Sequence, residues 1–374
     1  MIKIIADENI PFLKGVLEPY AKIKYLPGQQ IDRKILMNAD ALLVRTRTKC
    51  TADILRGTGV KFIGTATIGF DHIDTGFCET QGIKWTNAPG CNSSSVQQYI
   101  AAALLKLSFD FRSPLKSKTM GIVGAGNVGS KVAKLGKALG MNVLLNDPPR
   151  ARMEGTRLFS DLDTIMQKSD IITLHVPLNI GGEDKTYHLI NGMSVKKMKN
   201  GSWLFNTSRG EVAETSVLME ALDSGKIGAA VIDVWENEPD IDRELMDKTS
   251  IATPHIAGYS TDGKANGTSM VVNAIADYFG LPLGNWYPEQ LPAPLNPQIK
   301  VNGSGKDDES VIGEAVAHTY TISEDDLKLR LSPADFEKQR ADYPVRREFP
   351  CFRIKLKNCT RKVQKTLREI GFNV

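Results

Sequence analysis

The chain has 374 residues, more than one hydrophobic core usually organises, so two or three domains are expected. Hydrophobic residues at 41% and charged residues at 24% are ordinary for a soluble globular protein, and a net charge of +4 gives no reason to expect nucleic acid as a partner. The five cysteines show no C-x-x-C spacing and no stretch is apolar enough to span a bilayer, so we expect reduced thiols, no metal site, no membrane partner and a cytoplasmic location.

The first part of the chain, residues 1–95, alternates short β-rich runs with helical stretches. Strands are predicted at 2–6, 21–25, 41–44, 61–64 and 83–85. This alternation is typical of a parallel α/β sheet, whose ligands bind beyond the carboxyl ends of the strands. The polar residues at those ends are Asp7, Arg45, Thr46, Arg47, Thr65 and Thr67. We therefore expect the substrate to bind on this side of the sheet.

A glycine-rich loop, Gly124-Ala125-Gly126-Asn127-Val128-Gly129, lies between a predicted strand at 120–123 and a predicted helix at 130–139. This G-x-G-x-x-G pattern suits a dinucleotide, because its glycines allow a tight turn, close approach to a pyrophosphate and close packing of helix on strand. A second predicted strand, 142–146, ends at Asp147, which is placed to bind the adenine-side ribose. The predicted cofactor is NAD, although Arg150 weakens the preference over NADP.

The rest of the chain is expected to complete three domains. Residues 96–257 form the NAD-binding domain, with further strands at 171–176, 203–206, 229–234 and 250–252. A helix at 269–279 returns the chain, so that 258–281 join 1–95 in a substrate domain. Five prolines mark 282–297 as a linker. Residues 298–374 form a small α+β unit, with strands near 299 and at 352–356 and helices at 309–318, 333–343 and 361–370; a unit this small is expected to pack on a partner.

Oxidation of a secondary alcohol requires a base, and His255 in Thr253-Pro254-His255-Ile256-Ala257-Gly258 is the candidate. Glu238 is expected to hydrogen-bond its ring, whereas Glu236 is expected to face solvent. Arg209 follows a predicted strand and can grip a carboxylate in bidentate fashion. The weaker histidines are His72, His175, His188 and His318, of which the last two have no suitable acid nearby. The serines at 93–95 are interpreted as helix caps and not as nucleophiles.

Over roughly residues 1–280 these motifs, in this order, resemble the D-isomer-specific 2-hydroxyacid dehydrogenase family. Five further segments are similar to one branch of the family that has an extra C-terminal domain: Ala6-Asp7-Glu8-Asn9, Gly64-Thr65-Ala66-Thr67, Ala88-Pro89-Gly90-Cys91-Asn92, Asn146-Asp147-Pro148-Pro149-Arg150 and His255-Ile256-Ala257-Gly258-Tyr259. The resemblance implies an α/β fold with two Rossmann-like parallel-sheet domains, a cleft between them and a small C-terminal α+β dimerisation domain. It also implies a homodimer formed through that domain.

The resemblance assigns roles residue by residue. It implies that Arg209, Glu238 and His255 are catalytic and that Thr46, Thr67 and Tyr259 contact substrate. The implied cofactor-binding residues are Gly124, Gly126, Asn127, Val128, Gly129, Asp147, Val176, Thr207, Ser208, Arg209, Asp233 and Gly258. Val176 stands where the family has threonine, so its contact is expected through the backbone. Thr46 replaces a common serine and keeps the hydroxyl.

The expected reaction is the NAD-dependent oxidation of a small phosphorylated 2-hydroxy acid. Arg45 and Arg47 are proposed to bind the phosphate, because alternate residues of an extended segment project to the same side. Arg346 or Arg347 of the partner subunit is a further candidate. The alternatives are a dehydrogenase for 3-phosphoglycerate or an unphosphorylated acid, and a protein that senses NAD(H) without turnover. The presence of Arg209, Glu238 and His255 together favours an enzyme.

Overall fold

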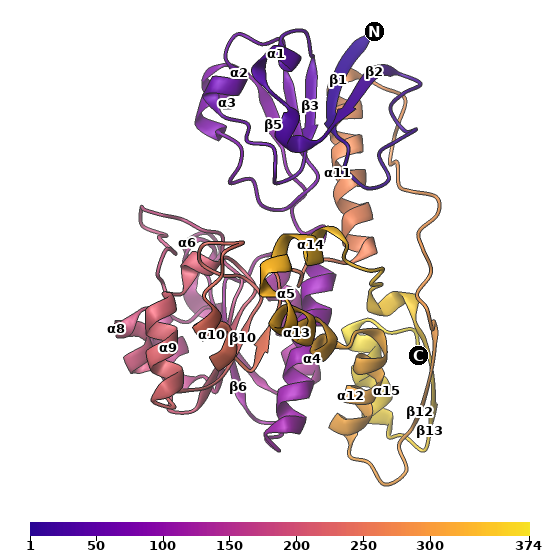
Figure 1. Cartoon of the computed structure of the whole chain (residues 1–374). Coiled ribbons are helices and arrows are strands. Elements are labelled where there is room, and N and C mark those ends of the chain that lie inside the picture. Colours follow the sequence, from indigo (N-terminus) through magenta and orange to yellow (C-terminus); the bar gives the residue numbers. More distant parts are fainter. The chain divides into compact units, whose positions relative to one another are not determined.

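The computed structural model describes all 374 residues and divides them into two compact units. The first comprises Met1–Asn92 and Ser260–Pro292, and the second comprises Ser93–Tyr259 and Ala293–Val374. Each contains a parallel sheet (Figure 1). No helix combines the length and apolar character that crossing a membrane requires.

The sheet of the first unit has the strand order β2-β1-β3-β4-β5 and is parallel throughout. Its strands are β1 (Ile2–Asp7), β2 (Ala21–Leu26), β3 (Ala41–Val44), β4 (Phe62–Thr65) and β5 (Lys84–Thr86). Every residue of β3 and β4 is buried, as expected of central strands covered on both faces. The short helices are η1 (Gly28–Gln30), α1 (Arg33–Leu36), α2 (Ala52–Leu55) and α3 (Thr75–Thr80).

The long helix α11 (Thr261–Phe279) packs on this sheet and begins eight residues before the predicted start at 269. Ser260 caps it by accepting a hydrogen bond from the Gly263 N–H at 2.8 Å. Val271 lies so close to Gly64 of β4 that a Cβ there would come within 2.7 Å of it. The glycines at 263 and 267, which weaken a helical prediction, therefore serve close packing.

The larger sheet of the second unit has the order β11-β10-β9-β8-β6-β7, again parallel. Its strands are β6 (Thr119–Val123), β7 (Asn142–Asn146), β8 (Ile171–Leu174), β9 (Ser202–Asn206), β10 (Ile227–Ile232) and β11 (Ile251–Ala252). After β6 the chain forms β7 on one side of β6, and it then crosses to form β8 on the opposite side of β6. The loops after β6 and β8 consequently diverge, which makes this a ligand-binding switch point.

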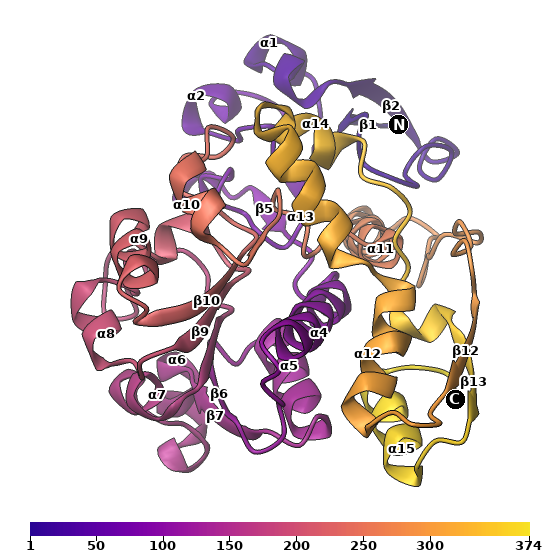
Figure 2. The ribbon, with the colours of Figure 1, turned by 60° about the horizontal axis from the view of Figure 1, so that its bottom comes forward.

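Helices cover both faces of this sheet (Figure 2). One face carries α4 (Ser93–Asp110) and α5 (Asn127–Ala138). The other elements are α6 (Pro148–Glu154), η2 (Thr156–Leu158), α7 (Leu162–Lys168), α8 (Gly192–Lys197), η3 (Gly210–Val212), α9 (Thr215–Asp223) and α10 (Arg243–Lys248). Among these, α7, α8, α9 and α10 contribute to the core of the opposite face.

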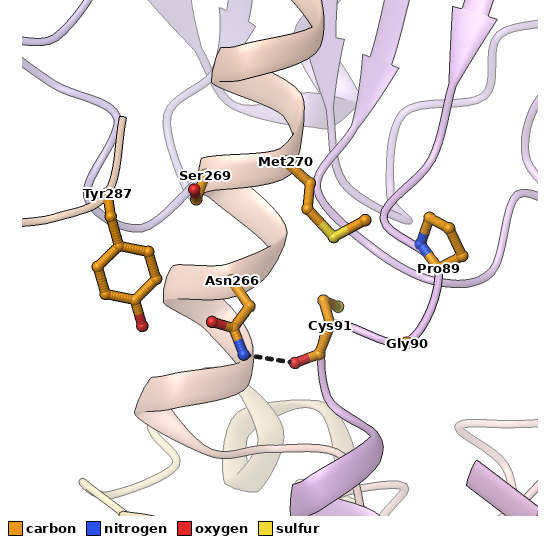
Figure 3. Close-up of a pocket in the computed structure, with 7 residues that line it drawn as sticks. All are labelled: Pro89, Gly90, Cys91, Asn266, Ser269, Met270 and Tyr287. Carbon is orange, nitrogen blue, oxygen red and sulfur yellow. Dashed lines mark hydrogen bonds between the residues drawn. The ribbon is translucent and has the colours of Figure 1, made fainter. Parts of the chain in front are cut away.

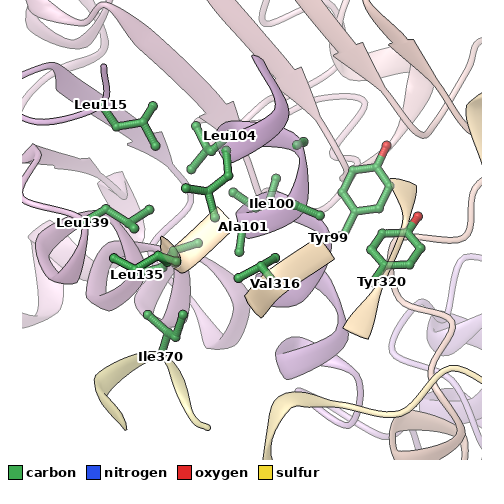
Figure 4. Close-up of a cluster of buried hydrophobic side chains, with 14 of the residues drawn as sticks. Tyr99, Ile100, Ala101, Leu104, Leu115, Leu135, Leu139, Val316, Tyr320 and Ile370 are labelled. Carbon is green, nitrogen blue, oxygen red and sulfur yellow. The ribbon is translucent and has the colours of Figure 1, made fainter. Parts of the chain in front are cut away.

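The C-terminal region, Ala293–Val374, packs on α4 and α5 of the same chain. Its elements are β12 (Gln298–Asn302), α12 (Asp308–Thr319), α13 (Ile322–Leu331), η4 (Pro333–Asp335), α14 (Phe336–Ala341), η5 (Phe349–Cys351), β13 (Arg353–Lys357) and α15 (Arg361–Ile370). Val316 and Ile370 share one buried cluster with Leu104 and Leu135 (Figure 4). The prediction missed α13 entirely and gave a single helix for η4 and α14.

Candidate active site

The glycine-rich loop between β6 and α5 has the geometry of a nucleotide-binding turn. Gly124 has φ of +89°, which residues with side chains rarely adopt, and a side chain at Gly129 would overlap the Gly124 carbonyl oxygen. No atom lies within 4 Å of the Cβ position of Gly126, so the loop is open to a ligand there. The helix begins at Asn127, which places the Asn127 and Val128 N–H groups where a pyrophosphate is favoured.

Asp147 follows β7 beside this loop. Its Oδ2 accepts a hydrogen bond from the Ala125 N–H at 2.9 Å, and its Oδ1 caps α6 by accepting one from the Arg150 N–H at 3.1 Å. The Arg150 guanidinium is paired with Glu154 at 2.7 Å. The Asp147 carboxylate suits the ribose of NAD and repels the 2′-phosphate of NADP. Arg150, whose charge is neutralised by Glu154, does not offset that repulsion. The residues of this edge therefore fit NAD.

His175, after β8, is a partly buried residue of the same edge. Its Nε2 lies 2.9 Å from Thr173 Oγ1, and its Nδ1 lies 3.3 Å from the hydroxyl of Thr207. Burial lowers its pKa to about 3, so the ring is neutral at physiological pH and too weak a base to serve as the proton acceptor. The backbone at His175 and the side chain of Val176 pack against Gly124, so β8 supports the glycine loop.

Arg209 lies in the loop between β9 and η3. Its Nη1 donates a hydrogen bond to the Ser208 carbonyl at 2.8 Å, and the Ser208 hydroxyl in turn donates to Asn206 at 2.8 Å. A side chain at Gly210 would overlap the backbone of Trp235, so the two loops touch directly. This close approach brings Arg209 beside the start of the segment that carries Glu238.

Glu238 and His255 form a hydrogen-bonded pair, with Glu238 Oε2 2.8 Å from His255 Nδ1. Glu238 Oε1 accepts a second hydrogen bond from the Trp235 N–H at 3.0 Å. Burial opposes the ionisation of Glu238, but the charge of His255 and these two hydrogen bonds outweigh it and lower the Glu238 pKa. Because Nδ1 is engaged and the His255 side chain is 31% exposed, Nε2 is the nitrogen available to a substrate.

Asp233, at the end of β10, holds the loop on which His255 sits. Its Oδ1 accepts hydrogen bonds from the Thr253 hydroxyl at 2.6 Å and the Ile256 N–H at 2.7 Å, and its Oδ2 accepts one from the Ala257 N–H at 2.9 Å. Burial raises the pKa of Asp233. His255 itself has φ of +55° and donates its N–H to the Asp233 carbonyl at 2.6 Å. This carboxylate therefore fixes an unusual backbone conformation next to the imidazole.

Two expectations about this segment are wrong. Glu236 does not face solvent: its Oε1 lies 2.8 Å from His188 Nε2, and its Oε2 accepts a hydrogen bond from the Thr215 N–H at 2.9 Å. His188 consequently has an acid partner, contrary to the sequence-based expectation. The sequence separation of 48 residues concealed the pair, which forms where the loop before α8 folds back over η3.

The substrate-side candidates of the first unit lie at the carboxyl ends of β3 and β4. Thr67 Oγ1 lies 2.8 Å from Thr65 Oγ1, which in turn lies 3.1 Å from His72 Nε2. The premise that Arg45 and Arg47 share an extended segment is wrong, because the chain turns after β3 and the Thr48 N–H donates to the Arg45 carbonyl at 3.4 Å. Arg45 Nη1 donates to the Asn9 carbonyl at 3.3 Å. Thr46 and Arg47 are exposed.

A pocket of about 270 Å³ also lies in the first unit, between α11 and the loop before α4 (Figure 3). Asn266 reaches across it and donates to the Cys91 carbonyl at 2.9 Å. The lining residues are Pro89, Gly90, Cys91, Asn266, Ser269, Met270 and Tyr287. None of them is charged, so this pocket offers no charged partner for a carboxylate or phosphate.

Gly258 and Tyr259 end the His255 loop, and side chains of the C-terminal region contact it. Arg346 Nη2 donates to the Ala257 carbonyl at 2.6 Å and its guanidinium lies over the Tyr343 ring. Because Arg346 is only 4% exposed and bound within its own chain, it is not available to a second subunit. The Arg340 guanidinium lies 5.8 Å from the Tyr259 ring centroid. Sequence reasoning missed Arg340, which no local motif marks.

A dinucleotide loop, an arginine and a glutamate–histidine pair at one sheet edge define an NAD-dependent dehydrogenase. A family model for the NAD-binding domain of D-isomer-specific 2-hydroxyacid dehydrogenases matches residues 98–257, and a model for a domain of unknown function matches residues 290–371. The structure of D-lactate dehydrogenase from Aquifex aeolicus, complexed with NAD and lactic acid, is 28% identical with a TM-score of 0.63, and covers 75% of this chain and 96% of that chain.

Relatives named erythronate-4-phosphate dehydrogenase match nearly the whole chain. The one from Bacteroides thetaiotaomicron is 49% identical and covers 94% of this chain and 99% of its own, and the one from Proteus mirabilis is 42% identical and covers 100% and 99%. The chain therefore belongs to the D-isomer-specific 2-hydroxyacid dehydrogenase family, within its erythronate-4-phosphate dehydrogenase branch. It is an NAD-dependent oxidoreductase.

Proposed function

We propose that the chain oxidises 4-phospho-D-erythronate to 2-oxo-3-hydroxy-4-phosphobutanoate with NAD, as a step in pyridoxal 5′-phosphate biosynthesis. The observation that carries the chemistry is the 2.8 Å contact between Glu238 and His255, on a loop fixed by Asp233. The names of the relatives supply the substrate. A soluble, cytoplasmic homodimer is part of the same proposal.

His255 is the general base. Glu238 binds Nδ1 and so fixes both the orientation of the ring and the tautomer whose Nε2 accepts a proton. Nε2 takes the proton of the C2 hydroxyl, which becomes a carbonyl as hydride leaves C2. NAD, when bound, accepts that hydride. The low pKa of Glu238 keeps its carboxylate ionised, so it stabilises the imidazolium that forms.

Arg209 binds the substrate carboxylate and polarises the neighbouring C2 oxygen. Its loop is anchored by Asn206, which binds both Ser208 and the Arg209 carbonyl, so the guanidinium is presented from a fixed backbone. Gly126, Asn127, Val128 and Asp147 hold the cofactor. Thr46, Thr67 and Tyr259 complete the substrate contacts, and Thr207, Ser208, Val176, Asp233 and Gly258 lie on the cofactor side.

The test of this assignment is His255→Gln, which keeps a hydrogen-bonding side chain but cannot accept the proton. Turnover should fall by about 10² to 10⁴, the usual worth of a positioned general base, while NAD affinity measured by calorimetry stays within about twofold. An acceptor oxo acid is included in the assay so that tightly held NADH cannot conceal turnover. If the variant retained wild-type turnover, another group would have to be the base.

A further inference from the structure

The C-terminal region reaches the His255 loop at three points. Asp326 of α13 accepts a hydrogen bond from the Ala252 N–H at 2.7 Å, just before the loop begins. Arg346 binds the Ala257 carbonyl at 2.6 Å. Arg340 of α14 lies over the ring of Tyr259, the last residue of the loop. A region described only as of unknown function therefore brackets the predicted base of the active site.

The contacts of Asp326 and Arg346 hold the C-terminal region against the His255 loop. Arg340 does not have a hydrogen-bond acceptor for each of its donors. Its side chain is only 16% exposed and lies between the rings of Tyr259 and Phe336, each 5.8 Å away. Glu337, which is 40% exposed, accepts one hydrogen bond from its Nη1 at 2.6 Å. The Nε atoms of Arg340 and Arg346 are both buried without a hydrogen-bond partner, but the Arg340 side chain is partly exposed whereas Arg346 is only 4% exposed. An unsatisfied donor on a charged group costs more than the roughly 1–3 kcal/mol of a neutral one, so a ligand that supplied an acceptor would be favoured.

The charge of Arg340 is felt at the reacting pair. Burial raises the pKa of Glu238, the charge of His255 lowers it, and Arg340 adds to that lowering. Arg340 is thus close enough to interact electrostatically with the glutamate while its aromatic neighbour Tyr259 is a predicted substrate contact. A planar guanidinium with several donors is the side chain best suited to bind a phosphate.

The comparison with relatives also associates the C-terminal region with a phosphorylated substrate. The D-lactate dehydrogenase structure covers 75% of this chain, whereas the relatives named for a phosphorylated substrate cover 94% to 100% of it. The C-terminal region is matched by a separate family model. Arg45 and Arg47, the earlier phosphate candidates, lie on a turn and not on the extended segment that motivated them.

We propose that Arg340 binds the phosphate of the substrate and so makes the C-terminal region the determinant of specificity for a phosphorylated acid. This inference rests on the proposed function. Tyr259 holds the guanidinium plane through a cation–π contact, and the phosphate satisfies the donors that Glu337 does not. Arg346 differs, because its buried contacts with the loop carbonyl and tyrosine rings make it a positioning residue.

The experiment compares 4-phospho-D-erythronate with unphosphorylated D-erythronate in the full-length enzyme. Arg340→Gln should lower kcat/KM for the phosphorylated acid, mainly through KM, by at least about tenfold more than it lowers kcat/KM for the unphosphorylated acid. Arg340→Lys keeps the charge but loses the planar guanidinium, so its kcat/KM for the phosphorylated acid should lie between those of the wild type and Arg340→Gln. The matched control is Arg353→Gln on β13, whose exposed side chain should leave both substrates unaffected.

The ratio of the two kcat/KM values separates recognition from structural damage. If Arg340→Gln lost activity equally on both substrates, and so kept the wild-type ratio, the inference would be overturned. It would also be overturned if the ratio fell in Arg45→Gln but did not change in Arg340→Gln. If the melting temperature shows that Arg340→Gln is not folded, the ratio measured with Arg340→Lys tests the inference instead. A wild-type enzyme with no preference for the phosphorylated acid would instead overturn the proposed function, and the inference with it.

Discussion

At the scale of residues, hydrogen-bond partners separate the two histidines at the edge of the second sheet. His175 is neutral and held by two threonine hydroxyls, whereas His255 is bound to an ionised glutamate. The two imidazoles therefore have different chemistry. Only the one with a carboxylate partner and an accessible second nitrogen suits proton transfer.

The low pKa of His175 makes stability depend on pH. Its pKa is about 3 in the fold against 6.5 when unfolded, so below pH 6.5 the unfolded chain binds the extra proton. The stability is fully present above pH 6.5 and is lost as the pH falls toward 3, by roughly 1 kcal/mol per pH unit. In denaturant titrations, His175→Gln should flatten this dependence between about pH 6.5 and 4. Parallel curves for variant and wild type would show that His175 is not buried as a neutral ring.

We expect Asp147 to control the choice of cofactor. Replacing it with serine removes the charge that repels a 2′-phosphate while keeping a cap for α6. We expect KM for NAD to rise by about tenfold and the preference for NAD over NADP to narrow, measured by initial rates with each cofactor. A preference unchanged from wild type would move the discrimination to another residue.

At the scale of elements, most of both sheets could be predicted because each strand is a short apolar run bounded by turn residues. The loop motifs placed Asp147, Arg209, Glu238 and His255 at strand ends for the same reason. Helix α13 could not be predicted: its sequence, ISEDDLKLRL, has no continuous apolar face. It forms because Asp326 and Arg330 bind backbone groups of β11 and the end of α10, more than 70 residues away. Arg340 was missed because its contact with Tyr259 is likewise with a residue far away in the sequence.

The packing of α5 on the glycine loop gives an element-scale prediction. In Gly129→Ala the new methyl group would overlap the Gly124 carbonyl oxygen, so α5 must move away from β6. We expect a loss of about 1–3 kcal/mol in the free energy of unfolding and a larger loss of NAD affinity. Gly126→Ala, where the Cβ position is open, is the matched control for stability. Equal stability of Gly129→Ala and wild type would contradict the close packing.

At the scale of the whole molecule, the C-terminal region is part of the second unit and not an appendage. It covers α4 and α5 with apolar side chains, and it accepts hydrogen bonds from them and from the following loop: Glu309 accepts one from the Leu115 N–H, and Thr319 accepts one from the Gln98 side-chain amide. The family model that ends at residue 257 therefore describes only part of a folded body. Formation of a homodimer through this region stays a prediction.

Truncation after Pro292 tests that view. Removing the C-terminal region would expose the apolar face of α4 and α5, so the shortened chain should aggregate or lose NAD binding, as measured by light scattering and calorimetry. A soluble fragment with wild-type affinity for NAD would show that the region is dispensable for the second unit.

The proposed substrate and base are tested together by the rate of NAD reduction by the wild-type enzyme, with an oxo acid acceptor present, across 4-phospho-D-erythronate, 3-phosphoglycerate, D-erythronate and D-lactate. We expect 4-phospho-D-erythronate to give the highest kcat/KM, the product to carry a carbonyl at C2, and His255→Gln to lower the rate by about 10² to 10⁴. Equal or faster oxidation of any other acid in the panel would contradict this expectation.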